Sequence, residues 1–212
     1  MSTEQSTVFI VDDDEEVCKS LCWLLQSVSL QTRCYSSAQD FLNYYCAHQS
    51  GCLLLDVRLP IISGLDLHKR LVAQNISLPV IILTGYGDVS MAVGAMKTGA
   101  FDFIEKPYND QILIDRVQQA IKYDARLRRD QVESQLLLTR LTQLTPRELE
   151  VMKQLVEGKA NKVIARELGI TYKTVEVHRA RIMEKTQANS IVELVHIALV
   201  CGILPRIEDY HY

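Results

Sequence analysis

The chain has 212 residues, of which 48% are hydrophobic and 23% are charged, values typical of a globular protein with one or two domains. No apolar stretch is long enough to span a membrane, and residues 1–5 lack the features of a signal peptide. The six cysteines form no C-x-x-C pair, and the five histidines have no ligand spacing, which argues against a zinc site. We therefore expect a cytoplasmic protein with reduced, buried thiols and no membrane partner.

The net charge of −3 is divided unevenly along the chain. Residues 1–120 carry 8 basic and 14 acidic residues, a net charge of −6, whereas residues 121–212 carry 15 and 12, a net charge of +3. Between Lys159 and Lys185 there are 7 basic and 3 acidic residues. This asymmetry predicts two domains, the second with a polyanionic partner. Charge alone is equally consistent with two ordinary solvated surfaces.

Short apolar runs alternate with helical patterns in the first half of the chain. Strands are expected at about 7–11, 31–35, 52–56, 79–83 and 101–105, and helices at about 15–28, 37–48, 64–74, 88–98 and 109–122. Continuous apolar runs of this length are typical of strands buried on both faces of a parallel sheet. The alternation predicts an α/β domain over residues 1–122, with a doubly wound, five-stranded parallel sheet and right-handed crossovers.

Polar residues follow four of these strands. Asp12 and Asp13 come directly after the first strand, Asp56 ends the third, Thr84 follows the fourth, and Lys106 follows the fifth. Because the carboxyl ends of parallel strands line one crevice, these side chains should converge there. Each of them alone has an ordinary explanation as a turn or cap residue. Their joint occurrence favours a site for a divalent metal and a phosphoryl group.

The residue types in this crevice suit phosphoryl transfer to a carboxylate. Asp13, Asp56 and the carbonyl of Arg58 could supply ligands to Mg²⁺, which prefers oxygen donors and few protein carboxylates. Asp56 could act as the nucleophile toward phosphorus. Lys106 and the metal would stabilise the phosphoryl oxygens, and the Thr84 hydroxyl could bond the transferred group.

A phosphatase of the haloacid-dehalogenase type is an alternative, because Asp12-x-Asp14 after a strand resembles the start of such enzymes. Those enzymes also need a late acidic pair after another strand. The chain beyond Lys106 has a helical pattern and offers no such pair. A receiver-like phosphatase with an incidental helical tail remains the runner-up.

The second half is predicted to be all-α. Residues 123–142 lack Pro and Gly and are rich in helix formers, which predicts a helical linker, either separate from the preceding helix or continuous with it. A flexible coil is the competing interpretation. Residues 143–212 should form a four-helix domain. Its first helix begins at the Thr145 capping box, and the others span about 161–168, 171–187 and 190–201.

The second and third of these helices are predicted to form a helix-turn-helix. Ala165 is small where the helices would cross, Gly169 permits the turn, and Val175 should point to the core with His178 and Ile182. An amphipathic helix often means only core packing, but a basic outer face favours DNA. Phosphate contacts are expected from Lys162, Lys173, Arg179, Arg181 and Lys185, and base contacts from Glu176, Val177 and Ala180.

The first ~120 residues resemble the receiver domain of two-component response regulators. The similarity lies in Asp12, Asp13 and Asp56, in Pro60 and Gly64, and in Thr84, Phe103 and Lys106-Pro107. Residues 143–205 resemble the LuxR-type output domain, most specifically in Leu144–Glu148 and Thr174–Arg179, which adds Thr174 to the expected DNA contacts. Together the two halves resemble the NarL/FixJ family, and within it the FixJ-like and StyR-like members.

This resemblance implies roles for individual residues. Asp56 would be phosphorylated by a sensor histidine kinase, Asp13 and Asp56 would bind Mg²⁺ directly, and Asp12 would bind it through water. Thr84 and Phe103 would be the switch pair, the Lys106-Pro107 bond would be cis, and Gly85 would leave room for the phosphodonor.

The sequence therefore predicts a transcriptional regulator, not an enzyme, that is switched by phosphorylation and acts as an activator. Expected partners are double-stranded DNA, the histidine kinase, a second copy of the chain when phosphorylated, and RNA polymerase. A third interpretation is a phosphorylation-independent DNA-binding protein whose acidic pocket is vestigial.

Overall fold

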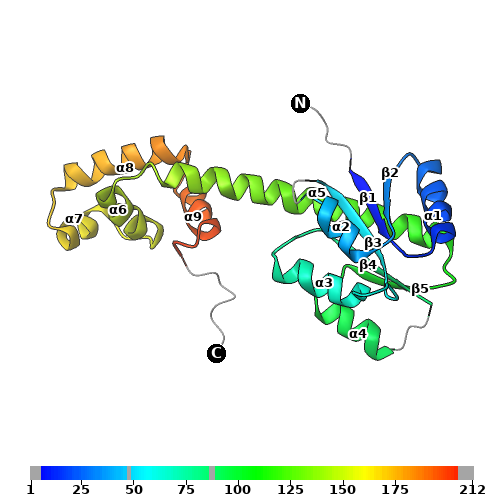
Figure 1. The fold of residues 1–212 in the computed structure, drawn as a ribbon. Helices are drawn as coiled ribbons and strands as arrows, with labels where there is room; N and C mark the ends of the chain where they lie inside the picture. Colours follow the sequence, from blue (N-terminus) through cyan, green and yellow to red (C-terminus); the bar gives the residue numbers. More distant parts are fainter. Residues whose placement is uncertain (1–5, 47–48, 86–88, 205–212) are drawn as a thin grey trace. The chain divides into compact units, whose positions relative to one another are not determined.

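The computed structural model describes residues 6–46, 49–85 and 89–204 (Figure 1). The chain divides into two compact units, Met1–Arg128 and Arg129–Tyr212. The division falls inside one long helix, so the predicted boundaries after residues 122 and 142 remain predictions. None of the helices in the described part of the chain combines the length and the apolar character needed to cross a membrane.

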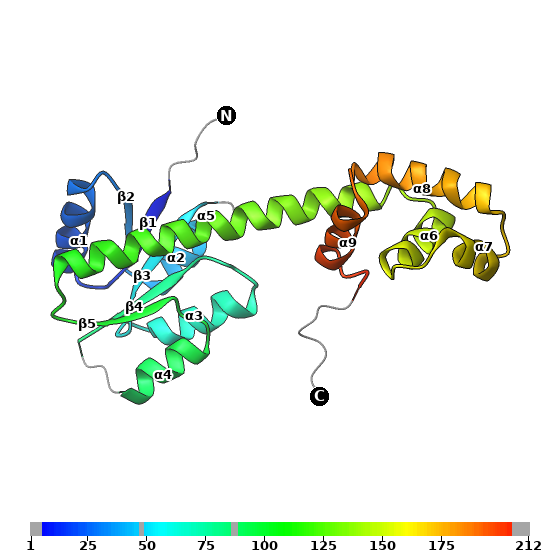
Figure 2. The same cartoon turned by 180° about the vertical axis from the view of Figure 1, so that it is seen from behind.

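Within the described residues, the first unit contains five parallel strands in one sheet. They are β1 (Thr7–Val11), β2 (Gln31–Tyr35), β3 (Gly51–Asp56), β4 (Val80–Thr84) and β5 (Asp102–Glu105). Their order across the sheet is β2-β1-β3-β4-β5, so β3 lies in its centre between β1 and β4 (Figures 1 and 2). Every residue of β3 and β4 is buried, as expected for strands covered on both faces. The predicted five-stranded parallel sheet is confirmed.

Helices cover both faces of this sheet and create two cores. One core joins Leu21 of α1 (Glu15–Ser27) to Leu113 of α5 (Asp110–Leu141) across one face. The other joins Phe41 of α2 (Ala38–Tyr44), Leu67 of α3 (Gly64–Ala73) and Ala95 of α4 (Val89–Lys97) across the opposite face. Alternate residues of β1, β3 and β4 point to the two cores, and helices on both faces give the doubly wound arrangement that the sequence predicted.

One helix is shorter than its pattern suggested. The expectation was a helix over 37–48, but α2 ends at Tyr44, and Tyr45 has extended backbone. Residues 47 and 48 lie outside the described residues. The ring of Tyr45 stacks on Phe41 with centroids 5.0 Å apart and meets Phe9 edge-on at 5.3 Å. Aromatic packing therefore accompanies the end of the helix, and a periodicity count does not detect it.

The region between the units is a single helix, α5, which runs from Asp110 to Leu141. Val117 near its start is buried in the sheet core, and Leu137 near its end is buried in the core of the second unit. The predicted helical linker is thus confirmed, the open question of its continuity with the preceding helix is answered by a single helix, and the flexible-coil interpretation is wrong.

The second unit contains α6 (Pro146–Val156), α7 (Asn161–Leu168), α8 (Tyr172–Thr186) and α9 (Ile191–Val200). The helices surround a core that includes Val151, Ile164, Ile182 and Leu194, all fully buried. The Thr145 capping box is present at the start of α6. Within the described part of this unit, up to residue 204, the predicted all-α domain with four helices is confirmed.

All six cysteines are free thiols, as the sequence suggested. The expectation that most are buried is wrong, because burial applies only to Cys18 and Cys52. Cys34 and Cys46 are exposed, and Cys22 and Cys201 are partly exposed. Cys34 lies on β2, an edge strand, which leaves its side chain less covered than an apolar pattern would indicate.

Candidate functional sites

The strand ends bring polar side chains to one edge of the sheet, as predicted. Asp12 directly follows β1, Asp56 is the last residue of β3, and Thr84 is the last residue of β4. Their exposed fractions are only 3%, 8% and 2%. Buried carboxylates require a partner of opposite charge, because desolvation disfavours an isolated ion.

Lys106 provides that partner. Its Nζ lies 2.8 Å from Oδ2 of Asp12 and 2.7 Å from Oδ1 of Asp56 and donates a hydrogen bond to each. Burial of the ammonium acts to lower the pKa of Lys106, but the hydrogen bonds and charges of the two aspartates outweigh it and raise the pKa above its usual value. The geometry thus joins the ends of β1, β3 and β5 in one ionic cluster.

The loop after Asp56 holds the carboxylate in place. The backbone N–H of Arg58 donates to Oδ2 of Asp56. Gly64 lies directly against this strand end, because a Cβ built on it would be 2.0 Å from the carbonyl oxygen of Asp56. The N–H of Gly64 donates to the carbonyl of Val57 at 3.0 Å, which fixes the return of the chain. Gly64 is therefore required by close packing.

The other two aspartates of the triplet occupy different positions. Asp13 is exposed at the rim of a hollow of about 260 Å³ that is also lined by Asp12, Glu15, Cys18, Cys34, Tyr35 and Ser36. Asp14 is the N-cap of α1, where its carboxylate accepts from the N–H groups of Glu16 and Val17. Asp14 thus has a structural role as a helix cap.

The donors at this edge of the sheet limit which metal ion could bind. Among the described residues, no group of three or more His, Cys, Asp or Glu side chains lies close enough together to hold one. Asp12 and Asp56 share the amine of Lys106, Asp13 lines the same hollow as Asp12, and Arg58 follows Asp56 by two residues. A hard cation that keeps several waters and takes one or two carboxylates fits this mixed set better than a metal that needs a full cage of side chains.

The predicted switch residues lie on neighbouring strands. Thr84 ends β4, and Phe103 pairs with Ile82 in the β4–β5 register and packs, half-buried, against the core. The N–H of Lys106 donates to the carbonyl of Thr84 at 2.6 Å. The Lys106-Pro107 bond is cis, as expected. Among the described residues, no atom lies within 4 Å of a Cβ built on Gly85, so they leave open space beside Thr84.

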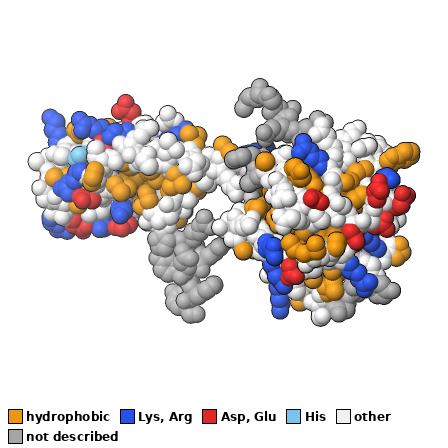
Figure 3. Space-filling model, viewed as in Figure 1, with side chains coloured by type: hydrophobic (Ala, Val, Ile, Leu, Met, Phe, Trp, Pro, Cys, Tyr) orange, Lys and Arg blue, Asp and Glu red, His pale blue; other side chains and the backbone are white. Residues whose placement is uncertain are grey.

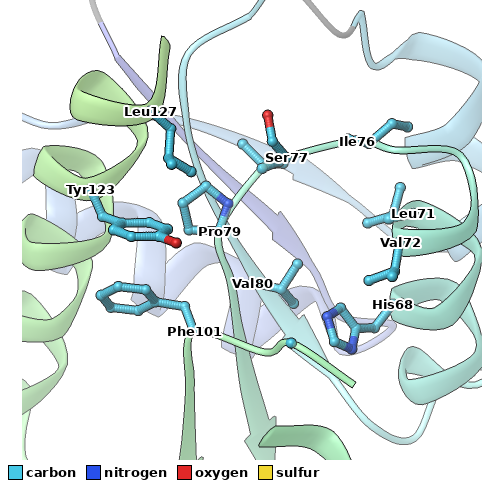
Figure 4. A pocket seen from close by; sticks show the side chains of 12 residues that line it. His68, Leu71, Val72, Ile76, Ser77, Pro79, Val80, Phe101, Tyr123 and Leu127 are labelled. Atoms are coloured by element: carbon cyan, nitrogen blue, oxygen red, sulfur yellow. The ribbon is translucent and has the colours of Figure 1, made fainter. Parts of the chain in front are cut away.

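A second hollow of about 260 Å³ lies away from these residues (Figure 4). Val80 at the start of β4 and Phe101 just before β5 line it, with His68 from α3 and Tyr123 from α5. It is therefore at the amino ends of the strands, opposite the acidic cluster, and contains none of the predicted site residues. Burial lowers the pKa of His68 below its usual value.

The helix-turn-helix has the local geometry that its sequence predicted. Gly169 adopts the left-handed conformation, with φ of 65°, at the end of α7. Thr171 caps α8 by accepting from the N–H of Thr174 at 3.1 Å. Val175 and Ile182 are fully buried, and the Nδ1 atom of His178 is buried with no hydrogen-bond partner among the residues that the structure describes. The predicted inward face of α8 thus packs on the rest of the unit.

The opposite face of α8 is accessible to a partner. Its exposed residues include most of the predicted DNA contacts, namely Lys173, Glu176, Val177, Arg179, Ala180 and Arg181. Lys162 on α7 is exposed as well, whereas Thr174 is half-buried and its hydroxyl bonds that of Thr171. Figure 3 shows Lys and Arg side chains along the edge of this unit that α8 forms.

Lys185 differs from the other predicted phosphate contacts. Its Nζ donates to Oε2 of Glu148 at 2.6 Å, and Glu148 is only 2% exposed. Burial acts to raise the pKa of Glu148, but the bonds from Lys185 and from Thr145 lower it to about 2. The amine of Lys185 is thus engaged inside the unit, and a phosphate contact would compete with this ion pair.

A buried polar network at the other end of β3 was not predicted. Asp124 of α5, 1% exposed, accepts from the N–H of Gly51 at 2.9 Å and from Nε of Arg128 at 2.8 Å. Arg128 also donates to the carbonyl of Gln49 at 2.6 Å. The network fastens α5 to the start of β3. An Asp and an Arg four positions apart on a helical pattern were the available signal.

Two family models match the chain. The response regulator receiver domain matches residues 8–118, and the luxR family of bacterial regulatory proteins matches residues 142–198. These are the two halves that the sheet with its acidic cluster and the helix-turn-helix unit define.

Known proteins are similar over most of their length. The transcriptional regulatory protein TdiR of Thauera aromatica is 44% identical over 92% of this chain and 86% of that protein. The transcriptional regulatory protein FixJ of Bradyrhizobium diazoefficiens is 41% identical over 95% and 98%. The solved structure of response regulator StyR is 39% identical and covers 92% of this chain and 98% of its own, with a TM-score of 0.81.

Fold and sites together define a response regulator with a DNA-binding output domain. The chain belongs to the NarL/FixJ family of response regulators. Its function is phosphorylation-dependent regulation of transcription, and the phosphatase alternative is not favoured.

Proposed function

We propose that Asp56 is the phosphoacceptor, that a sensor histidine kinase is its donor, and that α8 reads the target DNA. The contact of Lys106 with both Asp12 and Asp56 carries this proposal, because it joins three strand ends far apart in the chain. An acidic pocket with a fixed ammonium is suited to hold a phosphoryl group during transfer.

The transfer would use the carboxylate of Asp56 as nucleophile. One carboxylate oxygen attacks phosphorus, the bond from phosphorus to the donor atom breaks, and an acyl phosphate forms. Lys106 would then exchange its contact with Asp56 for one with a phosphoryl oxygen. The open space beside Gly85 would admit the donor.

Asp13, Asp56 and the carbonyl of Arg58 would hold Mg²⁺, with Asp12 acting through water. When bound, the ion would neutralise the neighbouring carboxylates and stabilise the phosphoryl oxygens. The mixed oxygen donors around Asp56 support this choice of metal.

Thr84 and Phe103 would transmit the change. A phosphoryl group adds negative charge and acceptor oxygens at Asp56. The hydroxyl of Thr84 would turn toward it, and Phe103 would move into the space that Thr84 leaves. Because the two residues lie on adjacent strands, the movement would alter the surface near β5.

The output domain would bind duplex DNA through the exposed face of α8. Lys173, Arg179 and Arg181, with Lys162 of α7, would contact phosphates, whereas Glu176, Val177 and Ala180 would contact base edges. Thr174 and Lys185 would make further DNA contacts at the border of this surface. We expect activation of transcription in the cytoplasm, with RNA polymerase as a further partner.

Phosphoryl incorporation from acetyl phosphate tests the proposal. The wild-type chain should be labelled in the presence of Mg²⁺, and chelation should abolish the label. Asp56→Asn should abolish it too, whereas Asp66→Asn, an exposed aspartate on α3, should leave it unchanged. Full labelling of the Asp56→Asn variant would assign the phosphate to another residue and overturn the proposal.

A further inference from the structure

Two free thiols of the receiver unit lie next to one another. Sγ of Cys22 on α1 is 2.8 Å from Sγ of Cys34 on β2. The helix packs beside this edge strand, and the two elements are neighbours in both views (Figures 1 and 2). Cys34 is exposed and Cys22 is partly exposed, so a small reagent can reach the pair.

The hydrogen bonds around the pair form a directed chain. The thiol of Cys34 donates to the carbonyl of Cys18 at 3.7 Å, and the thiol of Cys18 donates to the carbonyl of Asp12 at 3.5 Å. Because each thiol has one proton, the thiol of Cys22 is then the donor toward the sulfur of Cys34. The sulfur of Cys34 thus presents a lone pair to Cys22.

We propose that Cys22 and Cys34 are an oxidisable dithiol that forms a disulfide between α1 and β2. The sulfurs need to approach by about 0.8 Å to reach the S–S bond length of roughly 2.05 Å. A side-chain adjustment of this size leaves the sheet register and the helix in place. Disulfides in cytosolic proteins are usually transient and redox-sensing, which fits two accessible thiols held this close together.

The oxidant is hydrogen peroxide, and the step is balanced. One sulfur, as thiolate, attacks a peroxide oxygen and becomes a sulfenic acid, and the other peroxide oxygen leaves as hydroxide, which takes up the proton released by that thiol and becomes water. The second thiol then displaces the sulfenic hydroxyl as water and forms the S–S bond. In total the two thiols lose two electrons and two protons, which reduce one peroxide molecule to two molecules of water.

The position of the pair connects it to the acidic pocket. Cys34 lines the hollow that also contains Asp12 and Asp13. Oxidation removes the proton that Cys34 donates to the carbonyl of Cys18. The link therefore changes the hydrogen-bond chain that ends at Asp12 and ties α1 to the edge of the sheet.

Peptide mapping of the full-length protein after peroxide treatment tests this inference. We expect a loss of two mass units from the intact chain, two fewer thiols open to alkylation, and a peptide pair joined through Cys22 and Cys34. A reducing agent should reverse all three. Cys22→Ser and Cys34→Ser should each abolish the link, whereas Cys46→Ser, which changes an exposed cysteine outside the pair, should retain it.

The peptide map of the wild-type protein shows whether Cys22 and Cys34 form a disulfide, even where a serine variant folds poorly. A peroxide-treated chain in which Cys22 and Cys34 both remain open to alkylation would overturn the inference. Oxidation that joins other cysteines, or that stops at a sulfinic acid on Cys22 with Cys34 still free, would overturn it as well. Phosphoryl labelling is not part of this measurement, so its outcome is independent of the function proposed for Asp56.

Discussion

Glu148 and Lys185 form an ion pair that joins the first helix of the output unit to the end of α8. Oε2 of Glu148 lies 2.6 Å from Nζ of Lys185 and 2.8 Å from the N–H of Thr145. One carboxylate therefore completes the cap of α6 and holds the helix that is proposed to face DNA. Removing its charge should loosen both contacts.

We expect Glu148→Gln to lower the free energy of unfolding of the output unit by about 1–3 kcal/mol at neutral pH. The folded-state pKa of Glu148 is about 2, below its ordinary value of 4.5. The stabilisation is therefore complete above the ordinary pKa and is lost as the pH falls through about 2. Calorimetric unfolding between these pH values should show the difference between wild type and variant shrinking as the pH falls.

Glu150→Gln is the matched control, because Glu150 pairs with Arg147 on the surface of the same helix and is half-exposed. Its effect should be small at every pH. A stability difference for the Glu148→Gln variant that stays constant down to pH 2 would contradict the assigned role of the carboxylate.

Because of this ion pair, two basic residues of α8 that look alike in the sequence are expected to have different roles. Arg181 is exposed, whereas the amine of Lys185 is bonded to Glu148. For binding to duplex DNA, the logarithm of the association constant falls linearly with the logarithm of the salt concentration. Arg181→Ala should make this slope shallower by about 0.9, the value for one phosphate contact. Lys185→Ala should change this slope less and should destabilise the fold more. Equal slopes for the two variants, measured by fluorescence anisotropy, would assign Lys185 to the DNA contacts.

Most of the fold could be predicted because its signals are local. The apolar run of β1 ends with its strand, those of β3 and β4 end one residue before theirs, and the caps at Thr145 and Thr171 are short-range patterns. The convergence of Asp12, Asp56 and Lys106 followed from the rule that parallel strands share a carboxyl edge. These features depend on residues close together in the chain or on topology.

The unpredicted features depend on partners that are distant in sequence. Glu148 meets Lys185 across 37 positions, and Asp124 meets Gly51 across 73. No periodicity specifies such pairs. The early end of α2 likewise depends on contacts of Tyr45 with Phe9, which is 36 positions away. Tertiary packing, and not local propensity, thus determines these contacts and the end of α2.

Gly64→Ala should impair phosphoryl uptake, because the new methyl would lie 2.0 Å from the carbonyl oxygen of Asp56. The loop must shift, and the carboxylate of Asp56 shifts with it. We expect a loss of labelling by acetyl phosphate of roughly tenfold or more, since displacements of about 1 Å can cost 10²-fold in rate. Gly94→Ala is the control, because its methyl meets no atom within 4 Å. Normal labelling of the Gly64→Ala variant would show that the loop can yield without moving Asp56.

Arg128→Met should destabilise the receiver unit, because it leaves Asp124 buried without its cation. Loss of one partner from a buried ion pair typically costs about 3–5 kcal/mol, and we expect the lower end because Arg128 is itself 25% exposed. Arg129→Met, a change at an exposed neighbour on the same helix, should have an effect within about 0.5 kcal/mol. Urea unfolding followed by circular dichroism measures both. If the two variants unfold at similar urea concentrations, another group must stabilise the buried carboxylate of Asp124 when Arg128 is absent.

Phosphorylation should shift the chain from monomer to dimer. A helix-turn-helix normally binds two half-sites as a dimer, and α9 offers apolar surface for this purpose, since Val192 is 74% exposed and Ile191 is 36% exposed. The phosphoryl group at Asp56 can move the equilibrium between monomer and dimer only if its affinity for the two states differs. Contacts between receiver units would supply this difference in addition to α9.

Sedimentation with and without a phosphoryl mimic should show a larger mass with the mimic, and Val192→Asp should weaken this shift. Val132→Asp, at an exposed site on α5, is the matched change outside α9. An unchanged mass distribution together with stronger DNA binding would instead indicate release of an inhibitory contact between the domains.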